Sequence, residues 1–263
     1  AAVFAYLPSS YADLDGVTRL SIGVSWDPTA GSSGGVLGKL RRKTGTDLDL
    51  IAVAMQGGDP VRLAGLDSLD PMGNGSLVHS GDNQTGHGDG DDETVTVEFA
   101  RIPANVTSIV FIAAAYKKGS SFQKARNISF KVYDATGGTS QQVADIWPSL
   151  LTQDNGCAVA KAVRDGGSWK LEVINVTGKV KQGDEHALIR KLLAAVFSGA
   201  LAPEPPRRLA NQTAVVGRAV EFMEGRLDRV LTLFELCQEV GVSERTLRYA
   251  FSERFRLSPM AYF

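Results

Sequence analysis

The chain has 263 residues, of which 43% are hydrophobic and 22% charged, and its net charge is −1. This usage is typical of a globular protein with one large or two smaller domains, and the bulk charge indicates neither nucleic acid nor membrane as a partner. Cys157 and Cys237 fit neither a zinc-ligand spacing nor a disulfide framework, so we expect a reducing cytoplasm. No apolar run reaches the roughly 20 residues that span a bilayer, and we expect no signal peptide at the start of the chain.

The first 180 residues have the pattern of short β-strands. Apolar and polar residues alternate, as in half-buried strands, at 20–26, 95–99, 128–132 and 169–173. Continuous apolar runs, typical of more buried strands, occupy 48–55 and 109–116. Clusters of Gly, Pro, Asn and Asp separate these runs, so the pattern predicts a mainly β fold, either a sandwich or a barrel. The stretch 141–151 stays ambiguous because Pro148 disfavours a long helix.

The pattern changes after residue 183. Apolar residues recur at helical spacing within 184–201, and the segment 202–208 (APEPPRR) is typical of a linker. Helical spacing continues to the end of the chain, while most glycines lie before residue 184. We therefore predict a β domain at 1–183, a helix and linker at 184–210, and a small all-α segment at 211–263.

Residues 81–93 (GDNQTGHGDGDDE) hold five carboxylates and no Lys or Arg. Such crowding costs stability unless a cation offsets the repulsion, and calcium takes six to eight oxygen ligands from a flexible loop. The only soft donor is His87, which disfavours zinc or copper. The positions do not match an EF-hand, and a solvated acidic turn is the alternative. His79 and His87 flank the loop and are interpreted as supporting or surface groups.

Two further acidic elements precede the loop in the sequence. Asp47 and Asp49 stand at the start of the strand predicted at 48–55, on one face because strand neighbours alternate. Asp27 follows Trp26 at the end of another predicted strand. These aspartates are candidates to lend ligands to the loop from other strands.

These elements resemble the TerD family of tellurium-resistance proteins over residues 17–183. The resemblance rests on SIGVSWD at 21–27, DLD at 47–49, VHSGDNQTGHGDGDDE at 78–93, IVFI at 109–112 and WKL at 169–171. It implies a calcium-binding β-sandwich with two Ca²⁺ ions, acting against tellurite and chemical stress within membrane-associated complexes. The ligands that it implies are Asp82, Asn83, Asp89, Asp91 and Glu93, then Asp47 and Asp49, then Asp27 and Asp92. The chain departs from the family in a longer polar insertion at 59–72.

The last segment predicts a helix-turn-helix. Thr232 is a plausible N-cap for a helix ending near Gly241, and Ser243 caps a second helix at 244–255. The second helix of such a unit enters the major groove of DNA. Its outward side would present Arg245, Arg248 and Tyr249, with Leu247, Ala250 and Phe251 facing inward.

The residues at 190–263 resemble the first helix-turn-helix of AraC-type regulators, with Arg245, Arg248 and Tyr249 at the base-facing positions. Such domains carry two units, and we expect only the first within these 263 residues. Arg256 also stands where that family has Gly. Residues 207–256 hold nine arginines and seven acids, a weak charge for phosphate contacts.

Two functions follow as expectations. The first is a non-enzymatic, calcium-binding bacterial stress-response protein, cytoplasmic and peripheral to the inner face of the membrane, whose partners are other stress and tellurium-resistance proteins. The alternative is a transcription regulator with a calcium-binding sensor domain and an AraC-type DNA-binding segment. An enzyme is disfavoured because none of the three histidines stands in a nucleophile motif.

Overall fold

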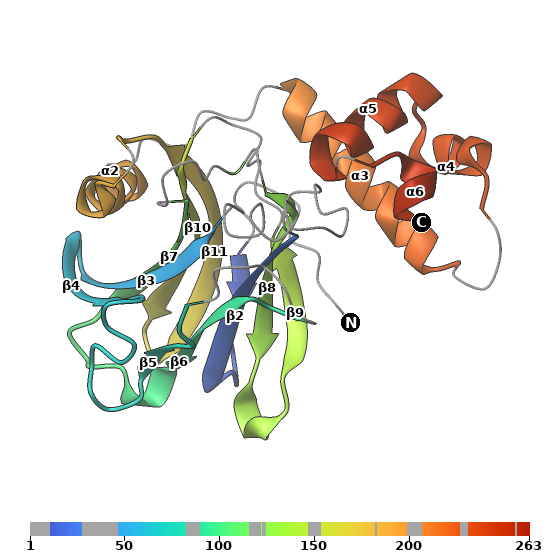
Figure 1. Cartoon of the computed structure of the whole chain (residues 1–263). Helices are drawn as coiled ribbons and strands as arrows, with labels where there is room; N and C mark the ends of the chain where they lie inside the picture. Colours follow the sequence, from blue (N-terminus) through green and yellow to red (C-terminus); the bar gives the residue numbers. More distant parts are fainter. Residues whose placement is uncertain are drawn as a thin grey trace, which may run out of the picture. The chain divides into compact units, whose positions relative to one another are not determined.

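The alternating segments form two antiparallel sheets in the computed structural model, which describes residues 11–27, 47–82, 90–115, 122, 125–146, 154–181, 183–198, 207–226, 231–255 and 257–263 (Figure 1). Sheet A has the order β1 (Tyr11–Asp13), β11 (Ser168–Gly178), β10 (Gly156–Asp165), β7 (Ser108–Ala114), β3 (Asp49–Gln56) and β4 (Asp59–Ala64). Sheet B has the order β5 (Leu77–His79), β6 (Glu93–Glu98), β2 (Arg19–Asp27), β8 (Arg126–Asp134) and β9 (Gln141–Ile146). Short 3₁₀ turns lie at Phe99–Arg101 and Thr136–Gly138. The prediction of a mainly β fold is confirmed.

One apolar core draws side chains from both sheets. Ile22 and Phe130 come from sheet B, while Ala52 and Phe111 come from sheet A, and all four are fully buried. The alternation in β2 explains which of its residues enter the core, because every second side chain of a strand points to the same face. The two strand sets therefore bury their apolar faces together, which holds β3 of sheet A close to β6 of sheet B.

Helix α2 (Glu185–Phe197) covers the other face of sheet A (Figure 1). Its Leu188 and Leu192 pack into a second cluster with Val53 of β3 and Val110 of β7. This cover explains why β3 and β7 are apolar on both faces, as their continuous apolar runs indicate. The side chain of Asp184 accepts a hydrogen bond from the Ala187 N–H at 2.9 Å and so caps the helix. The helix belongs to the first of two compact units, Ala1–Ala202 and Pro203–Phe263.

The polar insertion at 59–72 is ordered and partly β. A turn at Gly57 and Gly58 lets β4 pair with β3, so the insertion begins as an edge strand. Further on, the Asp70 carboxylate accepts hydrogen bonds from the N–H groups of Gly73 and Gly75, at 3.1 and 3.0 Å. In the ambiguous stretch 141–151, residues 141–146 form β9, and 147–151 lie outside the described residues.

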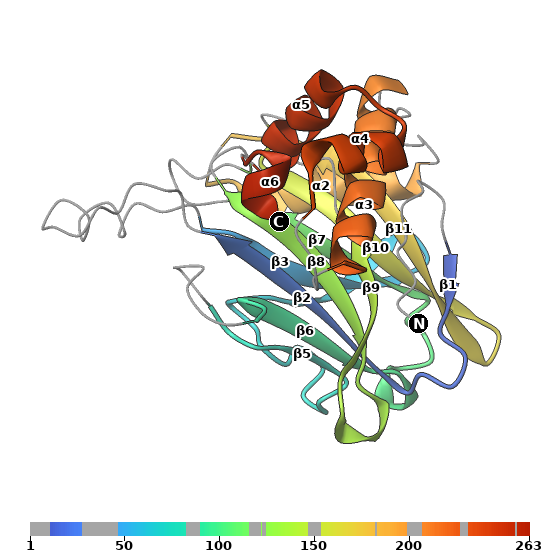
Figure 2. The ribbon, with the colours of Figure 1, turned by 90° about the vertical axis from the view of Figure 1, so that its right-hand side faces the viewer.

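The described residues of the second unit form four helices, α3 (Arg207–Glu224), α4 (Leu233–Val240), α5 (Glu244–Phe255) and α6 (Pro259–Tyr262) (Figure 2). Thr232 caps α4 in a reciprocal capping box with Glu235, as its position predicts. Gly241 ends α4 in the left-handed region, with φ 72° and ψ 35°, where glycine carries no steric penalty. The Thr246 N–H then donates to Ser243 Oγ at 3.3 Å at the start of α5.

The second unit has buried apolar residues of its own: Val215, Val216, Ala219, Val220, Met223, Leu236, Val240, Leu247, Ala250 and Phe251. Leu247, Ala250 and Phe251 are buried as predicted. Tyr262 of α6 stacks on Phe255 of α5 with ring centroids 4.2 Å apart. Among all helices within the described ranges, none has the length and apolar character needed to cross a bilayer.

Candidate metal centre

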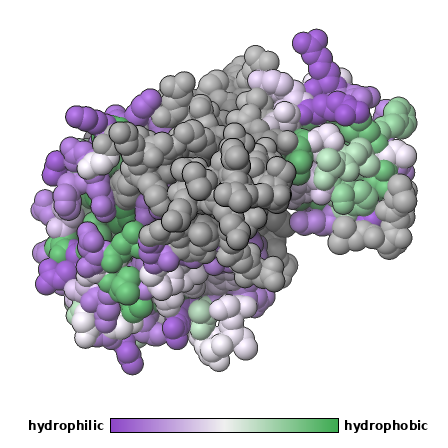
Figure 3. Space-filling model, viewed as in Figure 1, coloured by the Kyte–Doolittle hydropathy of each residue, from purple (hydrophilic) through white to green (hydrophobic). Residues whose placement is uncertain are grey.

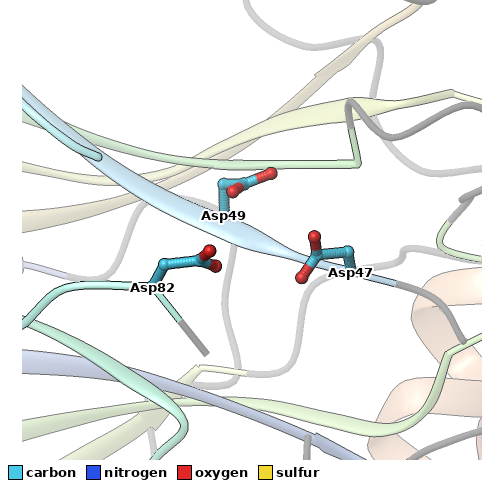
Figure 4. Close-up of side chains that lie close together, drawn as sticks. All are labelled: Asp47, Asp49 and Asp82. Atoms are coloured by element: carbon cyan, nitrogen blue, oxygen red, sulfur yellow. The ribbon is translucent and has the colours of Figure 1, made fainter. Parts of the chain in front are cut away.

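Three aspartates converge where sheet A meets the start of the acidic loop (Figure 4). Asp47 precedes β3 and Asp49 begins it, while Asp82 follows β5 of sheet B. One carboxylate oxygen from each lies within 4.8 Å of the other two. Asp47 and Asp49 are only 7% and 6% exposed, and Asp82 is exposed. The structure thus brings together three of the predicted ligands from two distant parts of the sequence.

The surroundings of Asp49 in this cluster disfavour the ionised form of its carboxyl group. Burial, followed by the charges of Glu93, Asp47, Asp82 and Glu185, raises the pKa of Asp49 from its ordinary value of 3.8 to about 8. The last of these charges comes from the first turn of α2. A nearby cation would reverse the effect, because it favours the ionised carboxylate.

Glu93, the first residue of β6, is fully buried behind the cluster. Its Oε2 accepts a hydrogen bond from the Leu50 N–H at 2.8 Å, and Leu50 directly follows Asp49. His79 Nε2 lies 3.4 Å from the same oxygen. Glu93 therefore joins sheet B to sheet A immediately beside Asp49.

Asp91 and Asp92 lie along β2 rather than in the three-aspartate cluster. The Trp26 N–H donates to Asp92 Oδ2 at 3.0 Å, and the Asp92 N–H donates to the Val24 carbonyl at 2.8 Å. Asp91 sits over Gly23, where a Cβ would collide with its carboxylate, so this close approach requires glycine. The Oδ1 of Asp91 is buried and has no hydrogen-bond partner among the described residues.

Several predicted ligands lie outside what the structure describes. Asn83 and Asp89 fall within 83–89, and the side chain of Asp27 is likewise not described, although its backbone ends β2. His87, interpreted as a supporting or surface group, also falls within 83–89. The donor set described here is therefore one part of the candidate site.

The predicted DNA-facing residues are exposed on α5. Arg245 and Arg248 are exposed, and Tyr249 is 45% exposed. Arg248 Nε donates to Glu244 Oε1 at 2.7 Å, a pair one helical turn apart that offsets part of the positive charge. Figure 3 shows both hydrophilic and hydrophobic residues at the surface of this unit.

Two residues near the cluster were not assigned a specific role from sequence. His79 is 2% exposed, and its ring contacts two backbone segments. It stands two residues after the buried Leu77 on the same strand, and this alternation indicates an inward side chain. Glu185 approaches from a helix much later in the chain, and no local pattern links it to the aspartates.

Known proteins show the same organisation in the first unit. The TerD domain family model matches residues 11–182. The chain is 33% identical to tellurium resistance protein TerZ of Serratia marcescens over 161 residues, covering 60% of this chain and 79% of that protein. It is 26% identical to stress response protein SCP2 of Bacillus subtilis (strain 168), covering 60% and 82%.

A solved structure supports the fold. The crystal structure of a homologue of telluride resistance protein (TerD) from Streptomyces coelicolor A3(2) has a TM-score of 0.51 and 18% identity, covering 65% of this chain and 96% of that one. Helices α2 to α6 lie beyond the residues that the family model matches. Because the TerD family model matches residues 11–182, which hold the strands of both antiparallel sheets, the chain belongs to the TerD family.

Proposed function

We propose that this chain is a calcium-binding stress-response protein whose cation site is built on Asp47, Asp49 and Asp82. The observation that carries the proposal is the convergence of these three carboxylates within 4.8 Å, two of them buried. Buried carboxylates normally need partners of opposite charge or a metal ion. A bound divalent cation would supply that charge.

The donor chemistry suits calcium. All three side chains offer hard oxygens, and the described cluster holds no thiolate or imidazole ligand, which zinc or copper would favour. Three carboxylates are fewer than the six to eight oxygens that calcium takes. Asn83 and Asp89 of the acidic loop, together with backbone carbonyls and water, would complete the shell.

A second ion is part of the proposal. Asp91 has a buried oxygen without a hydrogen-bond partner in the described part of the chain, and it lies over β2 next to Asp92. With Asp27 at the end of the same strand, these residues would hold the second ion. Glu93 would support the first ion by fixing Leu50 beside Asp49.

The proposed role is non-enzymatic. The two sheets would act as a β-sandwich platform, and the ordered acidic loop would form a surface for partner proteins. The names of the relatives favour other tellurium-resistance and stress proteins as partners. The location in the proposal, which those names do not give, is the cytoplasm at membrane-associated complexes.

Titration calorimetry of the full chain with calcium tests the site. The wild type should bind two ions, and Asp82→Asn should weaken the first site at least about tenfold, because the ligand charge count sets calcium affinity. Asp59→Asn, which removes an exposed carboxylate on β4, is the matched control and should bind as the wild type does. A wild type that binds no calcium would rule the proposal out.

A second candidate is a transcription regulator in which α4 and α5 form a helix-turn-helix of the AraC type. It is favoured by the left-handed Gly241 between the two helices and by Arg245 and Tyr249 on the exposed side of α5. The Arg248–Glu244 pair weakens it, because an acid on the reading helix repels phosphate.

An electrophoretic shift of a random duplex at low salt tests this candidate. Arg245→Ala with Arg248→Ala should abolish the shift, whereas Arg218→Ala, an exposed arginine of α3, should leave it nearly unchanged. Equal binding by the double variant and the wild type would exclude α5 as the reading helix.

A further inference from the structure

His79 bonds to backbone groups on both sides of the aspartate cluster. It ends β5 of sheet B, and its side chain is fully buried. The Gly81 N–H donates to its Nδ1 at 2.9 Å, and its Nε2 lies 2.8 Å from the carbonyl oxygen of Leu50. Gly81 precedes Asp82, and Leu50 follows Asp49. One ring thus contacts the backbone next to one aspartate on each sheet.

The hydrogen bonds determine the tautomer of the ring. An N–H can only donate, so Nδ1 accepts from Gly81, and a carbonyl can only accept, so Nε2 carries the hydrogen toward Leu50. Both ring nitrogens are used in this neutral form. The imidazole therefore bridges the backbone of Gly81 and that of Leu50.

The same contacts supply hydrogen-bond partners to the part of β3 that β4 does not pair with. The pairing of β4 with β3 ends at Ala52 opposite Ala64, two residues short of Leu50. At Leu50, side chains from sheet B take the place of a strand, because Glu93 accepts from its N–H and His79 contacts its carbonyl. Buried backbone groups need such partners. The start of β3, where Asp49 stands, is thereby held by side chains of the opposite sheet.

We infer that His79 is the positioning residue of the cation site: it holds the backbone of Asp82 at a set distance from that of Asp49. This inference rests on the proposed calcium site and deepens it. His79 touches no ion itself. It acts through Gly81 and Leu50, and groups that orient ligands in this way typically change metal affinity by about 10–100-fold.

Two variants separate the two contacts. His79→Asn places an amide oxygen near the position of Nδ1 and keeps the Gly81 bond, but it is too short to reach Leu50. His79→Gln places an amide N–H near Nε2 and keeps the Leu50 bond, but it loses the acceptor for Gly81. In the chelator-treated full chain, amide exchange at Gly81 should quicken at least about tenfold in the Gln variant and stay slow in the Asn variant.

Calcium titration of the full chain tests the function of the bridge. Both variants should lose affinity about tenfold or more. Val97→Ala, a buried β6 residue away from the cluster, controls for lost stability and should bind within about twofold of the wild type. If either His79 variant binds as the wild type does, the bridge does not position the aspartates and the inference fails. If the wild type binds no calcium, the proposed function fails, and this inference with it.

Discussion

Asp49 begins β3 almost fully buried, among four other carboxylates that all oppose its ionisation. Burial contributes most, because a carboxylate loses the water that stabilises its charge. A chain that keeps such a residue ionised in its core needs a compensating charge, and in the proposed function the cation supplies it. Stability without metal is therefore expected to depend on pH.

The sign of that dependence follows from the raised pKa. Between about pH 4 and pH 8 the unfolded chain releases the Asp49 proton while the folded chain keeps it, so rising pH favours unfolding. In chelator, the free energy of unfolding of the wild type should fall by a few kcal/mol across this window, since each pKa unit corresponds to about 1.4 kcal/mol. Denaturant unfolding at pH 5 and pH 8 measures it.

Asp49→Asn provides the comparison. Its amide does not titrate, so its stability should decline less between pH 5 and pH 8 than that of the wild type. Asp59→Asn should follow the wild type. Parallel pH profiles for the wild type and Asp49→Asn would show that Asp49 ionises normally in the folded chain.

At the scale of the elements, α2 is an integral part of the first unit although it lies beyond the family match. Leu188 packs so closely on β10 that a Cβ at Gly156 would lie 2.7 Å from its side chain. The helix also carries Glu185, whose charge acts on Asp49. The packing of α2 on sheet A therefore both covers the sheet and brings Glu185 near the aspartate cluster.

Leu192→Ala tests this packing. The side chain is fully buried against sheet A, and its loss should lower the free energy of unfolding of the first unit by about 2–5 kcal/mol. Arg190→Ala, on the exposed side of the same helix, should change it by no more than about 0.5 kcal/mol. Chemical denaturation followed by Trp fluorescence measures both. Similar small effects of the two changes would mean that α2 contributes little to the fold.

At the scale of the whole molecule, the chain holds two compact units with separate apolar cores. The candidate cation site lies entirely in the first unit, and the four helices of the second unit contribute no described residue to it. Where two units unfold independently, a ligand stabilises only the unit that binds it.

Scanning calorimetry of the full chain should therefore show two transitions, only one of which responds to calcium. Calcium at about 100 times its dissociation constant stabilises by about 2.7 kcal/mol for each ion bound, which corresponds to roughly 5–10 °C per ion for a unit of this size. Asp82→Asn should reduce that shift and leave the other transition unchanged. A calcium shift of equal size in both transitions would contradict independent units.

The sequence by itself determined the features that depend on local spacing. Alternation identified β2 and β6, the run 48–55 identified β3, and Thr232 with Gly241 bounded α4. These patterns are legible because strand and helix periods act within a few residues. The acidic composition of 81–93 predicts a cation-ligand loop, and that stays a prediction.

Only the tertiary structure decided which distant residues meet. Asp49 lies beside Asp82 because strands of two different sheets share one apolar core, and a strand pattern shows which face is apolar but not which strand will lie opposite. The positions of His79 over Leu50 and of Glu185 near Asp49 likewise depend on how sheets and helix pack. Local periodicity therefore determined which residues are available, and long-range burial of apolar surface determined which of them form the site.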